Sequence, residues 1–301
     1  MGDELITTQA SEVPSNLYWC PTGPLTFLPI HAAGLYDDSE KTTTIMDYAI
    51  SSYIPTIGTL LQQKTSEQQV GSGTDTADPF KMLVIVQPKA LPSTLHELRA
   101  IQGHIPKDAL VALGHPPSTP LATVSEVLRH LSTASIVHFA CHGKQNLGNP
   151  LESALLLDNG GKLSVERIMQ HDMRNAQLAF LCACETAMGE REVPDESMHL
   201  GAALLFAGFK GVVATMWWVR PIFCSSPVFL TKSGSNRSIA DQDGPKVAGK
   251  FYEYISGALS GETSHEISIE DSARALHFAV QTLRLEGVPL QRWVPFIHLG
   301  K

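Results

Sequence analysis

The segment SIVHFACHG (135–143) is an apolar run that ends in Cys141, His142 and Gly143. Residues 135–141 have the length and the β-branched and aromatic content of a buried strand. A strand that is apolar on both faces is typical of a parallel sheet with helices on each side. The segment therefore predicts an α/β fold, and we expect the flanking sequence to alternate between strands and helices.

The sequence after Pro79 shows this alternation. We expect strands at 82–87, 109–114, 135–141, 153–157, 176–184 and 210–217, and helices at 93–105, 123–131, 164–172 and 196–208. Two more helices, at 247–261 and 270–287, and a last strand at 291–300 follow. Strands that alternate with helices indicate parallel βαβ units. The predicted fold class is α/β, with a mostly parallel sheet flanked by helices on both faces.

The first 63 residues have weaker patterns. Residues 17–37 predict a short hairpin, with Thr22-Gly23-Pro24 as its turn. Residues 47–63 predict a strand followed by the start of a helix.

The composition excludes several classes of protein. With 301 residues, 43% of them hydrophobic and 17% charged, the chain resembles an ordinary globular protein. The net charge of −8 argues against nucleic acid or an anionic membrane as the main partner. We find no apolar run long enough for a membrane span and no signal-peptide pattern. Five cysteines without an export signal indicate a reducing compartment, so we expect a cytoplasmic or nuclear protein.

Two of the predicted strands end in reactive side chains. The strand at 135–141 is followed by His142, and the strand at 176–184 ends at Cys184. In parallel sheets, functional groups collect at the carboxyl ends of the strands. An imidazole within hydrogen-bond reach of a thiol promotes thiolate formation. Gly143 would leave its N–H open to an oxyanion. We therefore predict a Cys–His catalytic pair.

Other interpretations of these residues compete with that one. Cys182 and His138 lie within apolar strands, and we expect both in the core. A zinc site would combine Cys141, His142, Cys182 and Cys184. Zinc ligands usually come in pairs separated by two to four residues on loops, and this spacing differs. We therefore predict no metal site.

The ordered set of motifs resembles the CHAT family, which comprises caspase-like domains related to separases and often found after tetratricopeptide repeats. The resemblance spans residues 17–300 and rests on these segments: GPLTFLPIHAAGLY, SIVHFACHG, LESALLLDNGGKLSVERI, LAFLCACETAMG, PDESMHLGAALLFAGFKGVVATMW, FYEYI and WVPFIHLG. It implies a caspase-type fold and Cys–His hydrolysis of peptide bonds, without a cofactor.

The resemblance also implies roles for individual residues. HFACHG matches the histidine motif of the family and makes His142 the catalytic base, and LCACETA makes Cys184 the nucleophile. The N–H groups of Gly143 and Cys184 would then bind the oxyanion. Asp241, with Asp243 as second choice, would line a pocket for a basic substrate side chain. Alternatively, one of these two aspartates caps the helix predicted at 247–261.

The resemblance is interrupted at one place. In the family, the motif TMW runs directly into an S-I-x-D-x-D segment, whereas residues 218–237 separate the two here and follow no strand or helix period. We interpret this insertion as a retained intron or an error in the gene model. The expected organisation is an N-terminal extension, 1–16, and a single domain, 17–300, with the insertion inside it.

Two functions of different classes remain open. In the first, the chain is a cysteine endopeptidase that acts on a protein or peptide and is regulated by a tetratricopeptide-repeat region or another partner. Alternatively, it is a non-catalytic signalling or scaffold module, or a fragment of a larger repeat protein, that the insertion at 218–237 has inactivated.

Overall fold

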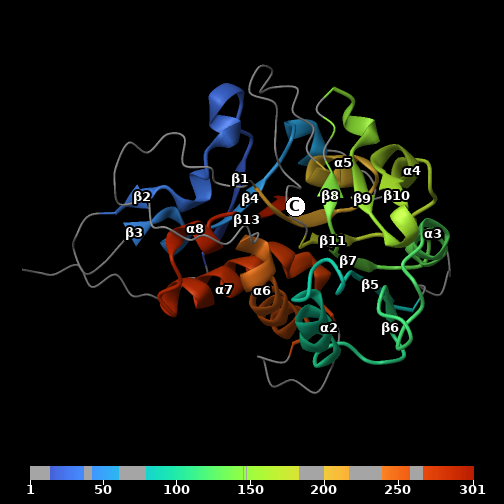
Figure 1. Ribbon diagram of the computed structural model, residues 1–301. Helices are drawn as coiled ribbons and strands as arrows, with labels where there is room; N and C mark the ends of the chain where they lie inside the picture. The colour runs from blue at the N-terminus through green and yellow to red at the C-terminus, as the bar shows by residue number, and fades with distance from the viewer. Residues whose placement is uncertain are drawn as a thin grey trace, which may run out of the picture.

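The computed structural model describes residues 14–36, 43–60, 79–144, 146, 148–182, 200–216, 239–257 and 267–301; for residues 27 and 239–242 it describes the backbone alone. A central eight-stranded sheet has helices packed against both of its faces (Figure 1). The predicted insertion at 218–237 and Cys184 lie outside the described residues.

The strand order of the central sheet is β1-β4-β13-β12-β11-β7-β5-β6. The strands are β1 (Ser15–Trp19), β4 (Ala49–Tyr53), β13 (Phe296–Gly300), β12 (Gly211–Thr215), β11 (Leu178–Leu181), β7 (Ile136–Ala140), β5 (Met82–Val86) and β6 (Leu110–Leu113). All neighbours pair in parallel except β12 and β13, which are antiparallel. The sheet is therefore mostly parallel, as predicted.

Two smaller sheets accompany the central one. Three antiparallel strands have the order β10-β9-β8, and a two-stranded sheet joins β2 to β3. Their bounds are β2 (Gly34–Leu35), β3 (Thr43–Thr44), β8 (Gly143–Lys144), β9 (Ala154–Leu156) and β10 (Lys162–Ser164). The strand predicted at 153–157 thus belongs to the three-stranded sheet.

The helices divide between the two faces of the central sheet (Figure 1). One face carries α3 (Val124–Leu131), α4 (Val165–Met169) and α5 (Leu200–Phe206). The other carries α2 (Thr94–Gln102), α6 (Ile239–Ile255), α7 (Ser272–Leu285) and the short α8 (Leu290–Trp293). These helices confirm the α/β fold class and the prediction that both faces are covered.

Strand β7 shows how the sequence produces two cores. Val137 and Phe139 pack with the α3–α5 side, whereas Ile136 and Ala140 pack with the α2–α6 side. All four side chains are fully buried, as the period-two alternation of a strand between two helical layers requires.

The hairpin predicted at 17–37 is wrong. Strand β1 begins at Ser15 and pairs in parallel with β4, and a 3-10 helix, Gly23–Phe27, occupies the predicted turn. Pro24 lies at the start of that helix, where its fixed φ angle and missing N–H are tolerated. The hairpin prediction failed because the partner of β1 lies far along the chain and not next to it. The strand predicted within 47–63 is present as β4.

The helix predicted at 247–261 begins earlier than expected. Helix α6 starts at Ile239 and contains Pro245 in its interior. Its apolar periodicity begins only at Val247, which explains the late predicted start. Asp241 and Asp243 therefore lie inside the helix, and the alternative in which one of them caps it is wrong.

Candidate functional site

Strands β7 and β11 are direct neighbours, and they deliver the two predicted catalytic segments to the same end of the sheet. Leu181, the last residue of β11, pairs with Phe139 of β7. After β7, Cys141 is buried and His142 is half-buried. After β11, Cys182 is buried, as predicted, and its N–H donates to the carbonyl of Phe139 at 3.0 Å.

The backbone of His142 is held from two sides. Its N–H donates to Oε1 of Gln87 at 3.2 Å, and its carbonyl accepts from the N–H of Leu156 at 2.7 Å. Gln87 follows β5, which lies next to β7 in the sheet. Gln87 was not predicted as a site residue. The one signal for it in the sequence is that it is the polar residue that ends the buried segment MLVIVQ (82–87).

Gly143 lies on β8, immediately after His142. Gly143 pairs with Leu155 of β9, and the bond from Leu156 N–H to the His142 carbonyl flanks this pair. In an antiparallel ladder, that pattern identifies Gly143 and Leu155 as a non-hydrogen-bonded pair. The N–H of Gly143 is therefore directed away from β9, and it is placed beside the predicted base.

Helix α6 approaches the end of β11 very closely at Gly244. A Cβ atom added to Gly244 would overlap Sγ of Cys182 and would lie 2.9 Å from Oε1 of Glu97 on α2. Glycine is required here because no side chain fits between these atoms. The contact brings α6, α2 and the end of β11 together.

Asp243, one of the two predicted pocket residues, is engaged within the protein. Its carboxyl oxygens accept from Nε of Arg292 at 2.7 Å and from Nη2 at 2.6 Å. The Asp243 side chain is 4% exposed and that of Arg292 is 37% exposed. Hydrogen bonding to Asp243 raises the pKa of the Arg292 guanidinium. Sequence reasoning did not identify Arg292, because the residue lies 49 positions after its partner.

Two of the predicted site residues cannot be placed. Cys184 lies outside the described residues, and Asp241 is described by its backbone alone, within α6. The structure therefore brings together His142, Gly143 and the end of β11, but it does not describe the thiol or the pocket carboxyl.

The zinc alternative conflicts with the positions of the buried cysteines. Cys141 packs on the α3–α5 side of the sheet, whereas Cys182 packs on the α2–α6 side. Two side chains on opposite faces of a sheet cannot bind one ion. Within the described residues, no group of three His, Cys, Asp or Glu side chains is arranged to hold a metal.

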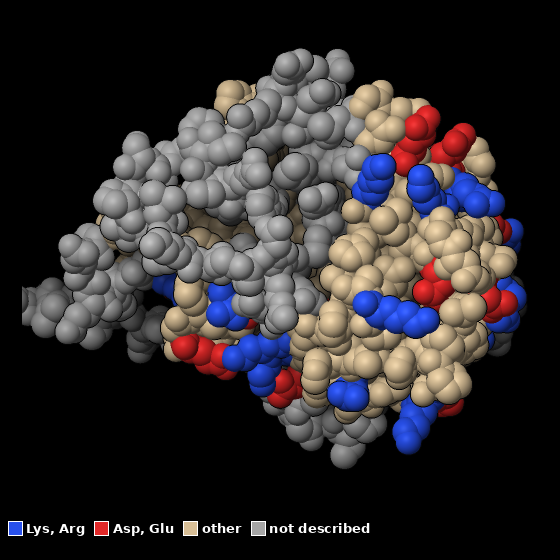
Figure 2. All heavy atoms as spheres, in the orientation of Figure 1, with Lys and Arg blue, Asp and Glu red and all other residues tan. Residues whose placement is uncertain are grey.

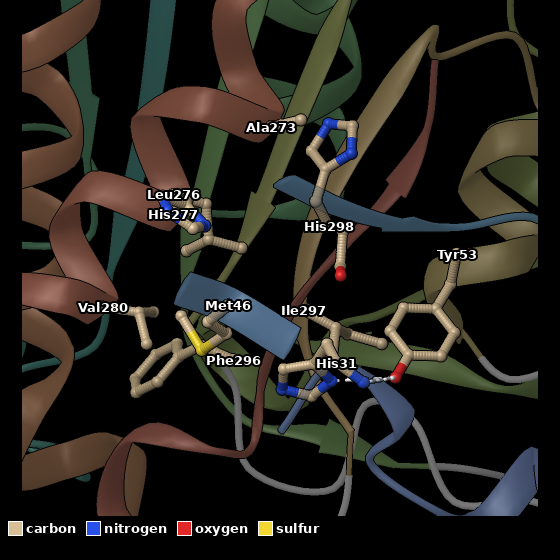
Figure 3. Close-up of a pocket in the computed structure, with 11 residues that line it drawn as sticks. His31, Met46, Tyr53, Ala273, Leu276, His277, Val280, Phe296, Ile297 and His298 are labelled. Carbon is tan, nitrogen blue, oxygen red and sulfur yellow. Dashed lines mark hydrogen bonds between the residues drawn. The ribbon is translucent and has the colours of Figure 1, made fainter. Parts of the chain in front are cut away.

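A second cluster of polar residues surrounds a small cavity of about 20 Å³ beneath α7 (Figure 3). His298 contacts Ser52 Oγ through Nδ1 at 2.8 Å and Ser272 Oγ through Nε2 at 2.9 Å. His31 contacts the Tyr53 hydroxyl through Nδ1 at 2.8 Å. The cavity has room for about one water molecule, and His298 is 1% exposed. A substrate therefore cannot reach these serines, and the cluster is part of the core.

The two histidines of this cluster are buried as neutral groups. Burial lowers the pKa of His298 to about 4. Burial also lowers the pKa of His31 to about 4, although its bond to the Val294 carbonyl opposes the shift. Neither side chain is a general base with access to solvent.

Charges of both signs are interspersed on the described part of the face in Figure 2. Lysine and arginine do not gather there into one stripe of the kind that binds a nucleic-acid backbone. In the part of the chain that the structure describes, no helix combines the length and the apolar character that a membrane span needs.

A family model of the CHAT domain matches residues 2–223, which confirms the resemblance seen in the motifs. Two crystal structures of the Saccharomyces cerevisiae separase–securin complex are similar, each with a TM-score of 0.48 and 15% identity over 85% of this chain. The match covers 14% of the separase-complex chain. A D-isomer specific 2-hydroxyacid dehydrogenase family protein from Aeromonas salmonicida has a TM-score of 0.29 and 13% identity, over 69% of this chain and 62% of its own. No curated protein sequence matches this chain.

Proposed function

This chain belongs to the CHAT-domain family, and we propose that it is a cysteine endopeptidase in which His142 and Cys184 form the catalytic dyad. The observation that carries the proposal is the pairing of β7 with β11. Leu181 lies opposite Phe139, 42 positions earlier, and Cys184 follows His142 by the same 42 positions. Neighbouring strands lie about 4.8 Å apart, and β7 and β11 finish at the same end of the sheet shortly before His142 and Cys184, which supports the assignment of these two residues as a pair.

The proposed reaction is hydrolysis of a peptide bond through an acyl-enzyme. His142 takes the proton of the Cys184 thiol, and the thiolate attacks the carbonyl carbon of the substrate. The N–H groups of Gly143 and Cys184 donate to the resulting oxyanion. His142 then returns its proton to the leaving amine, and water hydrolyses the thioester with His142 as base.

The geometry around His142 supports this assignment. Its backbone is fixed by Gln87 and Leu156, so the position of the imidazole base is restricted. The ring is half-buried, which leaves it access to a substrate. The N–H of Gly143 is directed away from β9, as an oxyanion donor requires.

We assign the selection of a basic substrate side chain to Asp241 and make Asp243 the second candidate. The carboxyl group of Asp243 already binds Arg292 through two hydrogen bonds, and the remaining acidic side chain of the pair is that of Asp241. The substrate class is a protein or peptide with a basic residue before the cleaved bond. The mechanism needs no cofactor.

We propose that the protein acts in the cytoplasm or nucleus and that a partner or repeat region regulates it. The chain spans only 14% of the separase-complex chains that it resembles.

One observation favours a second function. Residues 218–237 interrupt the family pattern ahead of Asp241. If this insertion displaces the pocket, the chain is a binding or scaffold module without peptidase activity.

Labelling with a peptide probe distinguishes the two functions. The probe is a short peptide with arginine next to an acyloxymethyl ketone, a group that alkylates an activated thiolate. We expect labelling of the wild-type protein and none of Cys184→Ala or His142→Ala. Cys20→Ala is the matched control, because it removes an exposed thiol that follows the edge strand β1, which is not a neighbour of β7 or β11, and it should leave labelling intact. Equal labelling of wild type and Cys184→Ala would contradict the peptidase proposal.

A further inference from the structure

We propose that Glu97, His138 and Tyr252 form a buried positioning network that fixes the end of β11 and helix α6 against β7. The network links the strand that precedes His142 to the strand that precedes Cys184. This inference rests on the proposed dyad of His142 and Cys184, and it assigns new positioning residues to it.

The three side chains form a continuous chain of hydrogen bonds. Nε2 of His138 lies 2.8 Å from Oε2 of Glu97, and its Nδ1 lies 3.1 Å from the hydroxyl of Tyr252. Burial raises the pKa of the Tyr252 phenol well above its ordinary value of 10, and so the phenol keeps its proton. Tyr252 can therefore donate to Nδ1, which leaves Nε2–H to donate to Glu97.

The network joins three elements that are far apart in the sequence. Glu97 belongs to α2, His138 to β7 and Tyr252 to α6. The ring of His138 also stacks on Phe180 of β11, with centroids 4.8 Å apart. The positions of β7, β11 and both helices are thus linked through one imidazole.

The network reaches the end of β11 directly. Oε1 of Glu97 and Sγ of Cys182 both lie against Gly244 of α6. Cys182 is the last described residue before Cys184. His138 belongs to β7 and lies four positions before His142, which follows that strand. Movement of Glu97 would therefore shift the groups that determine where both catalytic segments leave the sheet.

A role in stability alone does not explain these residues. Glu97 is 1% exposed, and His138 and Tyr252 are fully buried. Removing ionisable groups from water opposes folding, and apolar side chains of similar volume at such positions often give an equally stable or more stable protein. The feature that apolar replacements would lack is a directional set of bonds that fixes α2 and α6 relative to β7.

The experiment measures the rate at which iodoacetamide alkylates Cys184, located by fragmentation mass spectrometry, as a function of pH. A nearby imidazole accelerates this reaction at neutral pH, so the ratio of rates between wild type and His142→Ala reports the dyad. Misplacement of a catalytic group by about 1 Å can cost on the order of 100-fold in rate. We therefore expect Glu97→Ala and Tyr252→Phe to reduce the acceleration of Cys184 alkylation by about tenfold or more.

Three controls separate positioning from folding. Glu97→Gln keeps an acceptor for His138 and should retain the wild-type rate. Tyr53→Phe is matched to Tyr252→Phe, because it also removes a buried hydroxyl bonded to a histidine, and it should leave the rate unchanged. The double variant Glu97→Met with His138→Leu should remain folded by circular dichroism while its rate falls to that of His142→Ala.

Each result has one meaning. If His142→Ala leaves the rate of Cys184 unchanged, the dyad is absent, and both the proposed function and the network's role are wrong. If His142→Ala slows the reaction but the Glu97 and Tyr252 variants do not, the network proposal alone is wrong. An equal loss in Tyr53→Phe and Tyr252→Phe would also overturn it, because general destabilisation would then account for the effect.

Discussion

The Asp243 carboxyl is bound by the Arg292 guanidinium through two hydrogen bonds, of 2.7 Å and 2.6 Å. This arrangement links α6 to α8 at the sheet end where β13 begins. Bidentate pairs of this kind are strong and are directed in space. The bond therefore anchors the N-terminal half of α6 independently of any substrate.

Replacement of Arg292 tests the contribution of this pair to stability. Arg292→Ala leaves a buried carboxyl without its partner, and because Arg292 is partly exposed we expect a loss of about 2 kcal/mol in the free energy of unfolding. Urea denaturation measures it. Arg129→Ala is the control, since the Arg129–Glu126 pair is exposed and its loss should cost less than about 1 kcal/mol. Equal effects of the two substitutions would show that the burial of Asp243 does not increase the contribution of its ion pair to the free energy of unfolding.

The same geometry predicts which aspartate selects the substrate. Asp243 is already occupied by Arg292, so Asp241→Asn should reduce the preference for arginine over an uncharged residue in the peptide probe by about tenfold. Asp243→Asn should leave that ratio near the wild-type value, even if it lowers the amount of folded protein. The ratio of labelling rates for the two probes measures the preference. A loss of preference in Asp243→Asn alone would reverse the assignment.

Gln87 provides a test of how His142 is held. Gln87→Ala removes the acceptor for the His142 N–H, and we expect labelling of Cys184 to fall while the free energy of unfolding changes by about 1 kcal/mol or less. Gln87→Glu keeps an oxygen acceptor and should restore most of the labelling. If Gln87→Ala labels as fast as the wild type, this hydrogen bond does not position the base.

The sequence allows prediction of those parts of the fold that depend on local pattern. Strand β7 and the helices on both faces follow from alternating apolar segments, and His142 stands out because it directly follows such a strand. Pairing between distant segments has no local pattern, and for this reason the partnership of β1 with β4 was missed. Gln87 and Arg292 were missed for the same reason, because each acts through a residue about 50 positions away.

Helix α6 illustrates a different difficulty. Gly244 and Pro245 usually end a helix, yet both lie inside this one. The gap between Cys182 and Glu97 requires the glycine, and that requirement exists only in the folded protein. Tertiary packing here outweighs the intrinsic preference of the two residues.

The buried histidines predict a loss of stability in acid. His31 and His298 have pKa values of about 4 in the folded protein, against 6.5 in the unfolded chain. The unfolded state therefore binds more protons between pH 6.5 and 4, and stability falls as the pH decreases through this range. Each group contributes at most about 3 kcal/mol to that loss.

Denaturation in urea between pH 7.5 and 4.5 measures this dependence. His298→Asn should reduce the difference in the free energy of unfolding between pH 7.5 and 4.5, because it removes one of the two groups. His96→Asn replaces an exposed histidine and is the control, with a pH dependence like that of the wild type. If the free energy of unfolding of His298→Asn depends on pH as it does in the wild type, this histidine does not bind a proton on unfolding in this range.

The close approach at Gly244 predicts opposite effects for two glycines on the same helix. In Gly244→Ala the new methyl group meets Cys182 and Glu97, and we expect a loss of about 1–3 kcal/mol in the free energy of unfolding. In Gly249→Ala the new methyl lies 3.5 Å from Cβ of Ala100, an ordinary contact, and alanine favours the helix by about 0.5–1 kcal/mol. Thermal and urea denaturation of the two variants compare them directly. Because both substitutions add the same methyl to α6, a gain in stability from Gly244→Ala would show that α6 is not packed against the end of β11 as described.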